Sequence, residues 1–228
     1  MKTKTIISLT VIIVVFTIGL LSLILPENIS EWITGKTTTR AFIVETDPIN
    51  CSVNLTPGIN YVSFPCETGE LPLEEALKDI NNQKINFEYV FVYNPLDTKR
   101  PWKSYNPHIP NWTVQEDFTR IDRRIGYVIR VDEPTTYRAE GLKFPNTNNQ
   151  LRKGWNLVGY PSTEIKTIQE ATTTIEQEYE AIHSYQDING TKTWLYHIKN
   201  DGGTLTHFKP GYAYWIKMNE DAVWRLEW

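Results

Sequence analysis

The chain of 228 residues lacks the short motifs by which many enzymes and metalloproteins are recognised. It contains no His-Glu-x-x-His, no Gly-x-Ser-x-Gly, no Cys-x-x-Cys and no phosphate-binding Gly-x-x-x-x-Gly-Lys-Ser/Thr loop. Its four histidines are scattered along the sequence. We therefore predict that the protein is not an enzyme and has no catalytic, cofactor-binding or metal-binding residues.

Three weaker features do not change that prediction. His183 and His197 would lie near one another across a hairpin, but a metal site needs a third ligand, so cross-strand surface histidines are favoured. The sequence Asp187-Ile-Asn-Gly190 lacks the further carboxylates of a calcium loop and favours a plain turn. The adjacent Glu74 and Glu75 indicate a solvated helix face rather than a glycosidase pair.

Charged residues are missing from one long segment near the N-terminus. The apolar run Ile6–Leu25 is long enough to cross a bilayer core of about 30 Å as a helix. Lys2 and Lys4 precede it, which places the N-terminus in the cytoplasm and the rest of the chain outside. Because Pro-Glu-Asn-Ile-Ser after Leu25 fits a cleavage site poorly, a retained signal-anchor helix (1–26) is favoured over a cleaved signal peptide.

The part of the chain after this run has few basic residues and only two cysteines. It carries all 27 acidic residues and all but two of the 23 basic ones, so nucleic acid is disfavoured as a partner. Cys51 and Cys66 flank one predicted strand, which favours a disulfide in an exported domain. Asn-x-Ser/Thr sequons predict partial glycosylation, and the candidates are Asn28, Asn50, Asn54, Asn111 and Asn189.

The part of the chain after the apolar run contains an internal sequence repeat. Leu-Thr-Pro-Gly-Ile-Asn-Tyr-Val-Ser-Phe-Pro at 55–65 returns as Leu-Arg-Lys-Gly-Trp-Asn-Leu-Val-Gly-Tyr-Pro at 151–161. The match continues at later positions, where Tyr93 and Trp102 correspond to Tyr185 and Trp194, 126–131 to 213–218, and 137–140 to 224–227. Length changes fall between the matched blocks, where loops accept insertions. The matched blocks are therefore predicted to form the folded core of two tandem modules.

Each module shows the same predicted order of elements: an apolar strand, a helix, an aromatic hairpin and a closing hairpin. The strands and hairpins are predicted at 59–64, 89–93, 102–105, 127–131 with 136–139, and at 155–160, 181–185, 194–197, 212–218 with 223–227. The helices carry apolar stripes at Leu73, Ala76, Leu77 and Ile80, and at Ile168, Ala171, Ile175 and Tyr179, the second after a Thr167–Glu170 capping box. Asn189-Gly190 is a strong hairpin signal.

This pattern predicts an α+β fold that is mainly antiparallel β, with two tandem homologous modules of about five strands and one helix each after the transmembrane helix. The predicted domains are the anchor 1–26, a stalk with a lead-in strand at 27–52, module 1 at 53–141, a polar turn-forming linker at 142–150, and module 2 at 151–228. The two modules are expected to pack on each other as a pseudo-twofold pair, because each alone is marginally small.

The motifs Gly-Trp-Asn-Leu-Val-Gly-Tyr-Pro at 154–161 and Pro-Gly-Tyr-Ala-Tyr-Trp-Ile at 210–216 resemble a repeat module of archaeal and bacterial cell-surface and secreted proteins. The resemblance covers both copies, roughly residues 53–228. It implies an extracellular location and an accessory or structural role, and it supplies no catalytic residues. The Thr-rich stalk after an uncleaved span similarly resembles membrane-anchored archaeal surface proteins, including S-layer-like envelope proteins.

The aromatic residues leave two interpretations open. Recurrence at matched positions favours a core location for Trp102, Trp155, Trp194, Trp215 and Trp224. Alternatively, rings on the aromatic hairpins, namely Trp102, Tyr105, Trp194 and Tyr196, would be exposed and stack on sugars. Trp112, beside the sequon at Asn111 in a loop found only in the first copy, is a further candidate for ligand contact.

The leading hypothesis is a membrane-anchored surface protein, with one span and its C-terminal ectodomain outside the cell, that has a structural or adhesive role in the cell envelope. A first alternative is a module that binds carbohydrate or another ligand. A second alternative is a subunit of a pilin-like filament or membrane complex. The expected partners are therefore the membrane, other envelope or filament subunits, and glycans.

Overall fold

A computed structural model describes residues 49–66, 72–79, 81–109, 120–137, 140–141 and 146–227, all within one unit, Glu45–Trp228. The predicted anchor, residues 27–48 of the predicted stalk and lead-in segment, and the candidate residues Asn28, Asn111 and Trp112 lie outside these ranges. Within the ranges, no helix is both long enough and apolar enough to cross a membrane.

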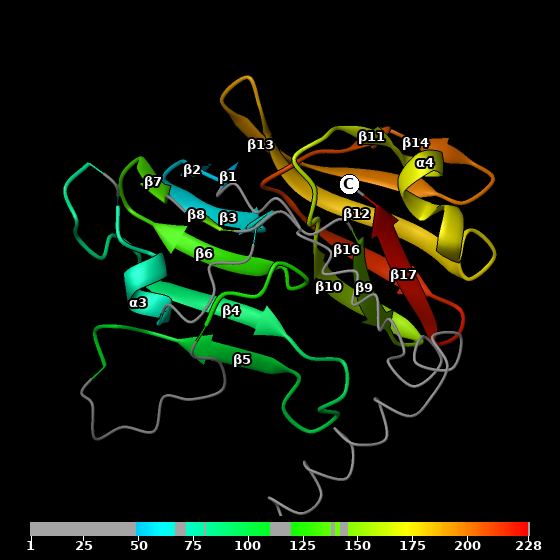
Figure 1. Ribbon diagram of the computed structural model, residues 1–228, viewed down its shortest axis with the longest axis horizontal. Helices are drawn as coiled ribbons and strands as arrows, with labels where there is room; N and C mark the ends of the chain where they lie inside the picture. Colours follow the sequence, from blue (N-terminus) through cyan, green and yellow to red (C-terminus); the bar gives the residue numbers. More distant parts are fainter. Residues whose placement is uncertain are drawn as a thin grey trace, which may run out of the picture. The chain divides into compact units, whose positions relative to one another are not determined.

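The first sheet consists of four antiparallel strands in the order β3-β6-β4-β5 (Figure 1). The strands are β3 (Gly58–Val62), β4 (Tyr89–Tyr93), β5 (Trp102–Tyr105) and β6 (Tyr127–Val131). Two short pairs flank this sheet: β2 (Val53–Leu55) with β7 (Thr135–Tyr137), and β1 (Ile49–Asn50) with β8 (Glu140–Gly141).

The second sheet consists of five antiparallel strands in the order β10-β16-β12-β13-β14. They are β10 (Gly154–Gly159), β12 (Tyr179–Ile188), β13 (Thr191–Ile198), β14 (Gly202–Gly203) and β16 (Ala213–Met218). The flanking pairs are β9 (Asn146–Leu151) with β17 (Ala222–Glu227), and β11 (Lys166–Thr167) with β15 (His207–Phe208). The fold is therefore mainly antiparallel β, as predicted.

The helices are short. The first, α3 (Leu73–Ala76), is a single turn that buries Leu73 and Ala76. The second, α4 (Ile168–Thr172), begins at the predicted capping box, in which the Thr167 hydroxyl accepts from the Glu170 N–H and the Glu170 carboxylate accepts from the Thr167 N–H. A 3₁₀ turn, Thr173–Ile175, follows. Tyr179 was wrongly assigned to the helix: it is the first residue of β12.

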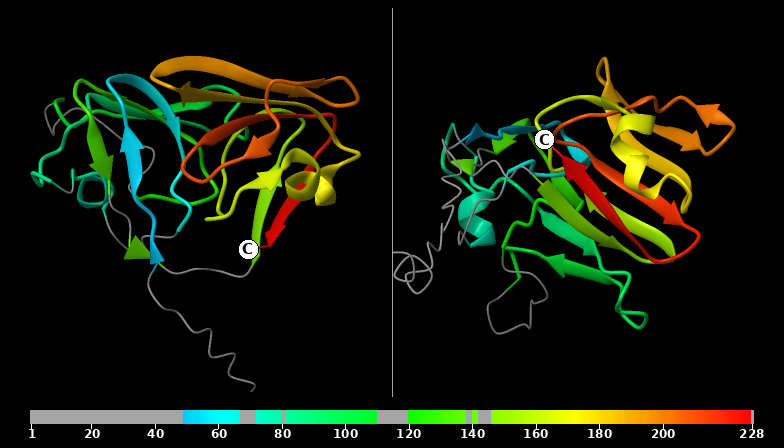
Figure 2. Two further views of the ribbon diagram at one scale, coloured as in Figure 1. Left: turned by 90° about the horizontal axis from the view of Figure 1, so that it is seen from above. Right: turned by 45° about the vertical axis from the view of Figure 1, so that its right-hand side comes forward.

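The two closing hairpins were predicted incorrectly. The strands β7 and β17 do not pair with the strands β6 and β16 that precede them, but with β2 and β9. Figure 2 shows the red strand β17 beside the yellow-green strand β9. Because β7 and β17 leave the two main sheets, the side chains of Tyr137 and Trp224 lie over the two cores, where both are fully buried. Burial of these large rings outweighs the local preference for a hairpin.

The predicted linker is also wrong in its second half. Residues 146–150 are not a turn but most of β9, whose side chains alternate between exposed and buried positions. Thr147 and Asn149 are the buried polar members, and Asn149 Nδ2 donates to the Arg124 carbonyl at 2.9 Å. Pairing with β17 satisfies the backbone of this polar segment, which has no apolar alternation to signal a strand.

Each sheet covers its own hydrophobic core. The first contains Phe64, Leu77, Val90 and Ile129, together with Cys51 and Cys66, which form the predicted disulfide with Cα atoms 6.0 Å apart. The second contains Tyr160, Ile182, Phe208 and Tyr214, and Trp224 donates its indole N–H to the Ala171 carbonyl at 2.6 Å. Trp224 is therefore a core residue, as recurrence at matched positions predicted.

The turns that enter β3 and β10 have matching geometry. Gly58 and Gly154 have φ angles of 90° and 91°, a left-handed conformation that side chains disfavour. Asn60 Nδ2 donates to the carbonyls of residues 56 and 58 at 2.9 Å each, and Asn156 Nδ2 donates to those of residues 152 and 154 at 2.7 and 3.1 Å. A buried asparagine thus fixes both turns from inside.

Candidate ligand-binding groove

The two sheets meet through the faces that point away from their own cores. Val128 of β6, Leu157 of β10 and Ala213 of β16 are buried in this contact, and Tyr61, Phe91, Tyr93 and Trp215 pack around them. Gly126 lies beside this cluster, where a Cβ atom would come within 2.9 Å of the Ala213 Cβ and the Val158 carbonyl oxygen. The absence of a side chain at Gly126 therefore allows the close approach of the sheets.

Backbone bridges join the sheets at two matched places. Val62 pairs with Tyr212, and Val158 pairs with Ile125. The hydrogen bonds beside them also correspond, because the Ser63 N–H donates to the Gly211 carbonyl at 3.0 Å and the Gly159 N–H donates to the Arg124 carbonyl at 2.9 Å. These bridges fix the angle between the two outward faces.

Where the faces diverge, they leave a groove of about 550 Å³. Among the described residues, six side chains line it: Tyr93 and Trp102 from the first sheet, and Trp155, His183, Trp194 and Trp215 from the second. Each of these six residues is aromatic, and none of them carries a carboxylate, an ammonium or a guanidinium group. The described lining therefore offers ring faces and a few polar ring atoms, but no charged side chain.

One side of the groove is a connected set of rings. Trp215 lies 5.1 Å from Tyr93, 5.8 Å from Trp102 and 6.3 Å from Trp155, measured between ring centroids. Trp155 in turn lies 5.1 Å from the His183 ring. All of these pairs are edge-to-face, the geometry that the ring quadrupoles favour. These contacts hold each ring in place while part of its surface stays open.

The Trp194 side of the groove is supported by other rings. Trp194 lies 5.1 Å from Tyr185 on the neighbouring strand β12 and 5.1 Å from Tyr61 on β3 of the other sheet. Tyr61 and Tyr185 are 5.7 Å apart. The position of Trp194 thus depends on how β13 sits against the first sheet.

The prediction that most tryptophans lie in the core is wrong for three of them. Trp102, Trp155 and Trp194 expose 44%, 36% and 47% of their surface, and Trp215 is half-buried. The alternative of exposed hairpin rings holds for Trp102, Trp194 and Tyr196, whereas Tyr105 packs against the first core. Recurrence at matched positions indicated a shared role but could not distinguish a core from a shared surface.

A signal for the groove is present in the sequence of the strands. Tyr214-Trp-Ile216 in β16 and Tyr89–Tyr93 in β4 place large apolar side chains on both faces of a strand. A sheet with only one covered face would alternate apolar and polar residues. Apolar residues on both faces of these strands indicate a second packing surface, which here becomes the sheet contact and the groove.

Burial changes the acid–base behaviour of two rings at this surface. It lowers the pKa of His183, which favours the neutral imidazole. Burial, with smaller contributions from Tyr185 and Tyr89, raises the pKa of Tyr61 above its usual value. Both groups are therefore uncharged near neutral pH, in keeping with the lack of charge in the groove.

The glycosylation candidates that the structure describes do not form a cluster with the groove. Asn50 is in β1 and pairs with Glu140. Asn54 is exposed on β2, and its side-chain oxygen accepts from the Thr136 hydroxyl at 2.9 Å. Asn189 is exposed in the β12–β13 turn with a φ angle of 53°. The exposed side chains of Asn54 and Asn189 are sterically accessible for modification.

The weaker chemical features have structural explanations. His183 pairs with Tyr196 and His197 pairs with Ile182, so the two histidines point to opposite faces of the sheet and do not meet. Asp187 Oδ1 accepts from the Gly190 N–H at 2.7 Å, which is the interaction of a plain turn. Among the described residues, no group of three His, Cys, Asp or Glu side chains is placed to hold a metal ion.

Glu74 and Glu75 are exposed on α3. Glu75 pairs with Lys78, and the Tyr105 hydroxyl donates to Glu74. Adjacent acids on one short helix therefore make separate surface contacts, as a solvated helix face would.

Comparison of the chain with known protein families, curated proteins and solved structures finds no match. The aromatic groove is therefore interpreted from its own geometry. Its open ring faces can stack on flat apolar surfaces, and its indole, phenol and imidazole groups can hydrogen-bond to hydroxyl or carbonyl oxygens of a ligand.

Proposed function

We propose that the protein is a membrane-anchored, extracytoplasmic surface protein that binds neutral glycans through the aromatic groove and so has an adhesive role in the cell envelope. The observation that supports it best is the set of six aromatic side chains that line one groove and remain partly exposed. Single exposed apolar residues are common on protein surfaces, but a contiguous group indicates a binding site.

The ring faces suit a carbohydrate ligand. The C–H groups on one side of a pyranose ring carry a small positive charge and form a flat apolar surface, which complements the negative face of an indole ring. Trp102 and Trp194, one from each sheet, present rings of nearly equal exposure. A glycan chain would stack one sugar on each, while its hydroxyl groups accept from indole N–H groups or from Tyr93.

The lack of charge in the lining favours a neutral glycan over an acidic one. An acidic sugar would bind best with an arginine or lysine beside its carboxylate, and the described residues of the lining include neither. His183 does not supply this charge near neutral pH because burial lowers its pKa. Neutral hexoses and N-acetylhexosamines are therefore the proposed ligand class.

The surface location rests on sequence features together with the disulfide. The apolar run Ile6–Leu25, the sequons and the resemblance to cell-surface repeat modules all support an exported ectodomain. The Cys51–Cys66 disulfide is typical of proteins outside the cytoplasm. The shared strand order of the two sheets and the matched turns at Gly58 and Gly154 support a duplicated module.

Binding should be measured with the full-length protein in detergent micelles. Isothermal titration with cellohexaose, chitohexaose and mannohexaose is expected to detect at least one of these glycans. Replacing Trp102 or Trp155 by Ala should weaken binding about 5- to 30-fold, because each loses roughly 1–2 kcal/mol of apolar contact. Ile165→Ala, which removes an exposed side chain outside the groove, is the control and should bind normally.

Two results would contradict the binding proposal. The first is that the wild-type protein binds none of the three oligosaccharides. The second is that a proline-rich peptide binds in their place, since aromatic grooves also accept polyproline helices. Orientation is tested separately by adding protease to intact cells, where an ectodomain that survives untouched would refute the surface location.

A further inference from the structure

The hairpin formed by β12 and β13 extends from the second sheet to the turn that enters β3 of the first sheet. Lys192 and Trp194 are two residues apart on β13, so their side chains lie on the same face of the strand. Lys192 reaches the turn at residues 56–60, whereas Trp194 lines the groove. One strand therefore carries both a contact to the opposite sheet and part of the ligand surface.

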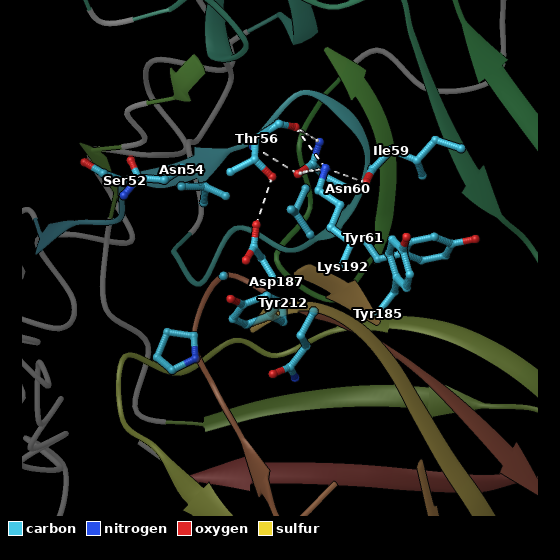
Figure 3. A pocket seen from close by; sticks show the side chains of 15 residues that line it. Ser52, Asn54, Thr56, Ile59, Asn60, Tyr61, Tyr185, Asp187, Lys192 and Tyr212 are labelled. Carbon is cyan, nitrogen blue, oxygen red and sulfur yellow. Dashed lines mark hydrogen bonds between the residues drawn. The ribbon is translucent and has the colours of Figure 1, made fainter. Parts of the chain in front are cut away.

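The ammonium group of Lys192 is surrounded by oxygen atoms of that turn. Its Nζ donates to the backbone carbonyls of Thr56, Pro57 and Ile59 at 3.0, 2.9 and 2.9 Å, and lies 3.2 Å from Asn60 Oδ1. Figure 3 labels Lys192 together with Thr56, Ile59 and Asn60. A lysine ammonium has three N–H donors and suits a compact cluster of acceptors. The oxygens of the turn thus form a binding site for this one side chain.

Contacts within the turn also hold its carbonyl oxygens in place. Gly58 adopts a φ angle of 90°, and Asn60 Nδ2 ties the carbonyls of Thr56 and Gly58 together. Asp187, at the end of β12, accepts a 3.3 Å hydrogen bond from the Thr56 hydroxyl and supplies a nearby negative charge. Burial lowers the pKa of Lys192, an effect that Asp187 opposes.

The contact made by Lys192 is adjacent to the rings that support Trp194. Tyr61 follows Asn60 on β3, and its ring packs against both Tyr185 and Trp194 from the hairpin. Fixing β13 to the 56–60 turn therefore also fixes the distance between Trp194 and the first sheet, which supplies Tyr93 and Trp102 to the groove.

The matched turn of the second sheet is held differently. At residues 152–156 the asparagine bonds are the same, but Arg152 and the Lys153 N–H bond to Asp221 from the β16–β17 connection. On the opposite side of the groove, Trp102 is instead supported by the rings of Tyr93 and Trp215. Lys192 thus joins the strand of Trp194 to a turn of the opposite sheet, whereas Lys103 beside Trp102 pairs with Asp97 of its own hairpin.

We propose that Lys192 is a positioning residue of the groove: by binding the 56–60 turn it sets the position of Trp194 for ligand stacking. The proposal rests on the groove being the binding site. It assigns Lys192 no contact with the ligand, so its effect on affinity must act through Trp194.

A double-mutant cycle tests this coupling, with titration of the oligosaccharide that the wild-type protein binds most tightly. Lys192→Met keeps the length of the side chain but removes its donors, and should weaken binding about tenfold. In a Trp194→Ala background the same substitution should have no further effect, whereas in a Trp102→Ala background its full effect should remain. Lys199→Met, at the end of the same hairpin, is the matched control and should bind as wild type.

Amide hydrogen exchange provides a second measurement that needs no ligand. In Lys192→Met the amides of residues 186–194 should exchange at least tenfold faster, while those of β10 and β17 keep their rates, which also shows that the variant is folded. Lys192→Arg should restore protection only in part, because a planar guanidinium fits a compact acceptor cluster poorly.

The outcomes separate the two proposals. If the wild-type protein binds no oligosaccharide but the hairpin of Lys192→Met exchanges faster, the glycan proposal fails and the lysine contact stands as a structural anchor only, which overturns the positioning role. Equal losses of affinity in the wild-type and Trp194→Ala backgrounds would also overturn it, as would unchanged exchange in the hairpin.

Discussion

Replacing Gly159 by Ala should separate the two sheets at one of their bridges. A Cβ atom at this position would lie 2.3 Å from the Arg123 carbonyl oxygen and 2.8 Å from that of Ile125. Both atoms belong to backbone, which cannot rotate away as a flexible side chain would. The substitution therefore requires a shift of about 1 Å between β10 and the segment before β6, since ordinary contacts of this kind begin near 3.4 Å.

The expected cost follows from the interactions that this shift disturbs. The hydrogen bond from Gly159 N–H to the Arg124 carbonyl would lengthen, at about 1 kcal/mol. Loosening the packing of Val128, Leu157 and Ala213 adds roughly 1–3 kcal/mol. Replacing glycine by alanine also reduces the conformational freedom of the unfolded chain, which offsets about 0.4–1 kcal/mol of this cost. The free energy of unfolding should thus fall by about 2–3 kcal/mol.

Urea denaturation followed by tryptophan fluorescence measures this effect. With an m value of about 2–3 kcal/mol/M, the midpoint should fall by roughly 1 M. Ser63 occupies the matched position, where its hydroxyl donates to the Tyr212 carbonyl and accepts from the Tyr160 N–H. Ser63→Gly is therefore the control: it loses these bonds without a clash and should cost less than Gly159→Ala. A Gly159→Ala midpoint equal to or above that of the wild type would refute the steric argument.

Three other predictions concern stability. Replacing Cys51 and Cys66 by Ser should lower the free energy of unfolding by about 3 kcal/mol, as expected for a loop of this size, and reduction of the wild type should have the same effect in urea titrations. Burial lowers the pKa of His183 below that of the unfolded chain, so the neutral ring contributes its full stability above about pH 6.5. As the pH falls below this value the unfolded chain binds the proton more readily, and the free energy of unfolding should decrease. His183→Gln should flatten this decrease between about pH 7 and 5. Thr167→Ala should cost about 1 kcal/mol by removing the hydroxyl that caps α4, and a midpoint unchanged from wild type would contradict the role of the Glu170 capping box.

Local chemistry in the sequence was sufficient for several elements. The Asn189-Gly190 pair predicted the β12–β13 turn, because both residues tolerate the positive φ angles of 53° and 83° that they adopt. The Thr167–Glu170 spacing predicted the start of α4 in the same way. The cysteine spacing around one strand predicted the disulfide between Cys51 and Cys66. Each of these signals depends only on residues close together in the chain.

The predictions that failed depend on contacts between distant residues. No local feature shows that β7 and β17 leave their sheets, since Tyr137 and Trp224 are buried by elements far away in the sequence. The polar strand β9 has no apolar alternation and exists because β17 pairs with it. Trp102 and Trp194 have the same aromatic character as the core rings, and only the angle between the sheets leaves them open to solvent.

The sequence by itself determined that the described part of the chain is mainly antiparallel β, where its tight turns lie, and which cysteines form the disulfide. These features follow from strand alternation, turn residues and short spacings, which act over a few residues. Tertiary structure alone decided that aromatic residues at matched positions line a groove, and that Lys192 binds the turn of the opposite sheet. These features arise where two sheets meet, and the free energy of that contact depends on groups that are more than 100 positions apart, such as the Lys192 ammonium and the Thr56 carbonyl.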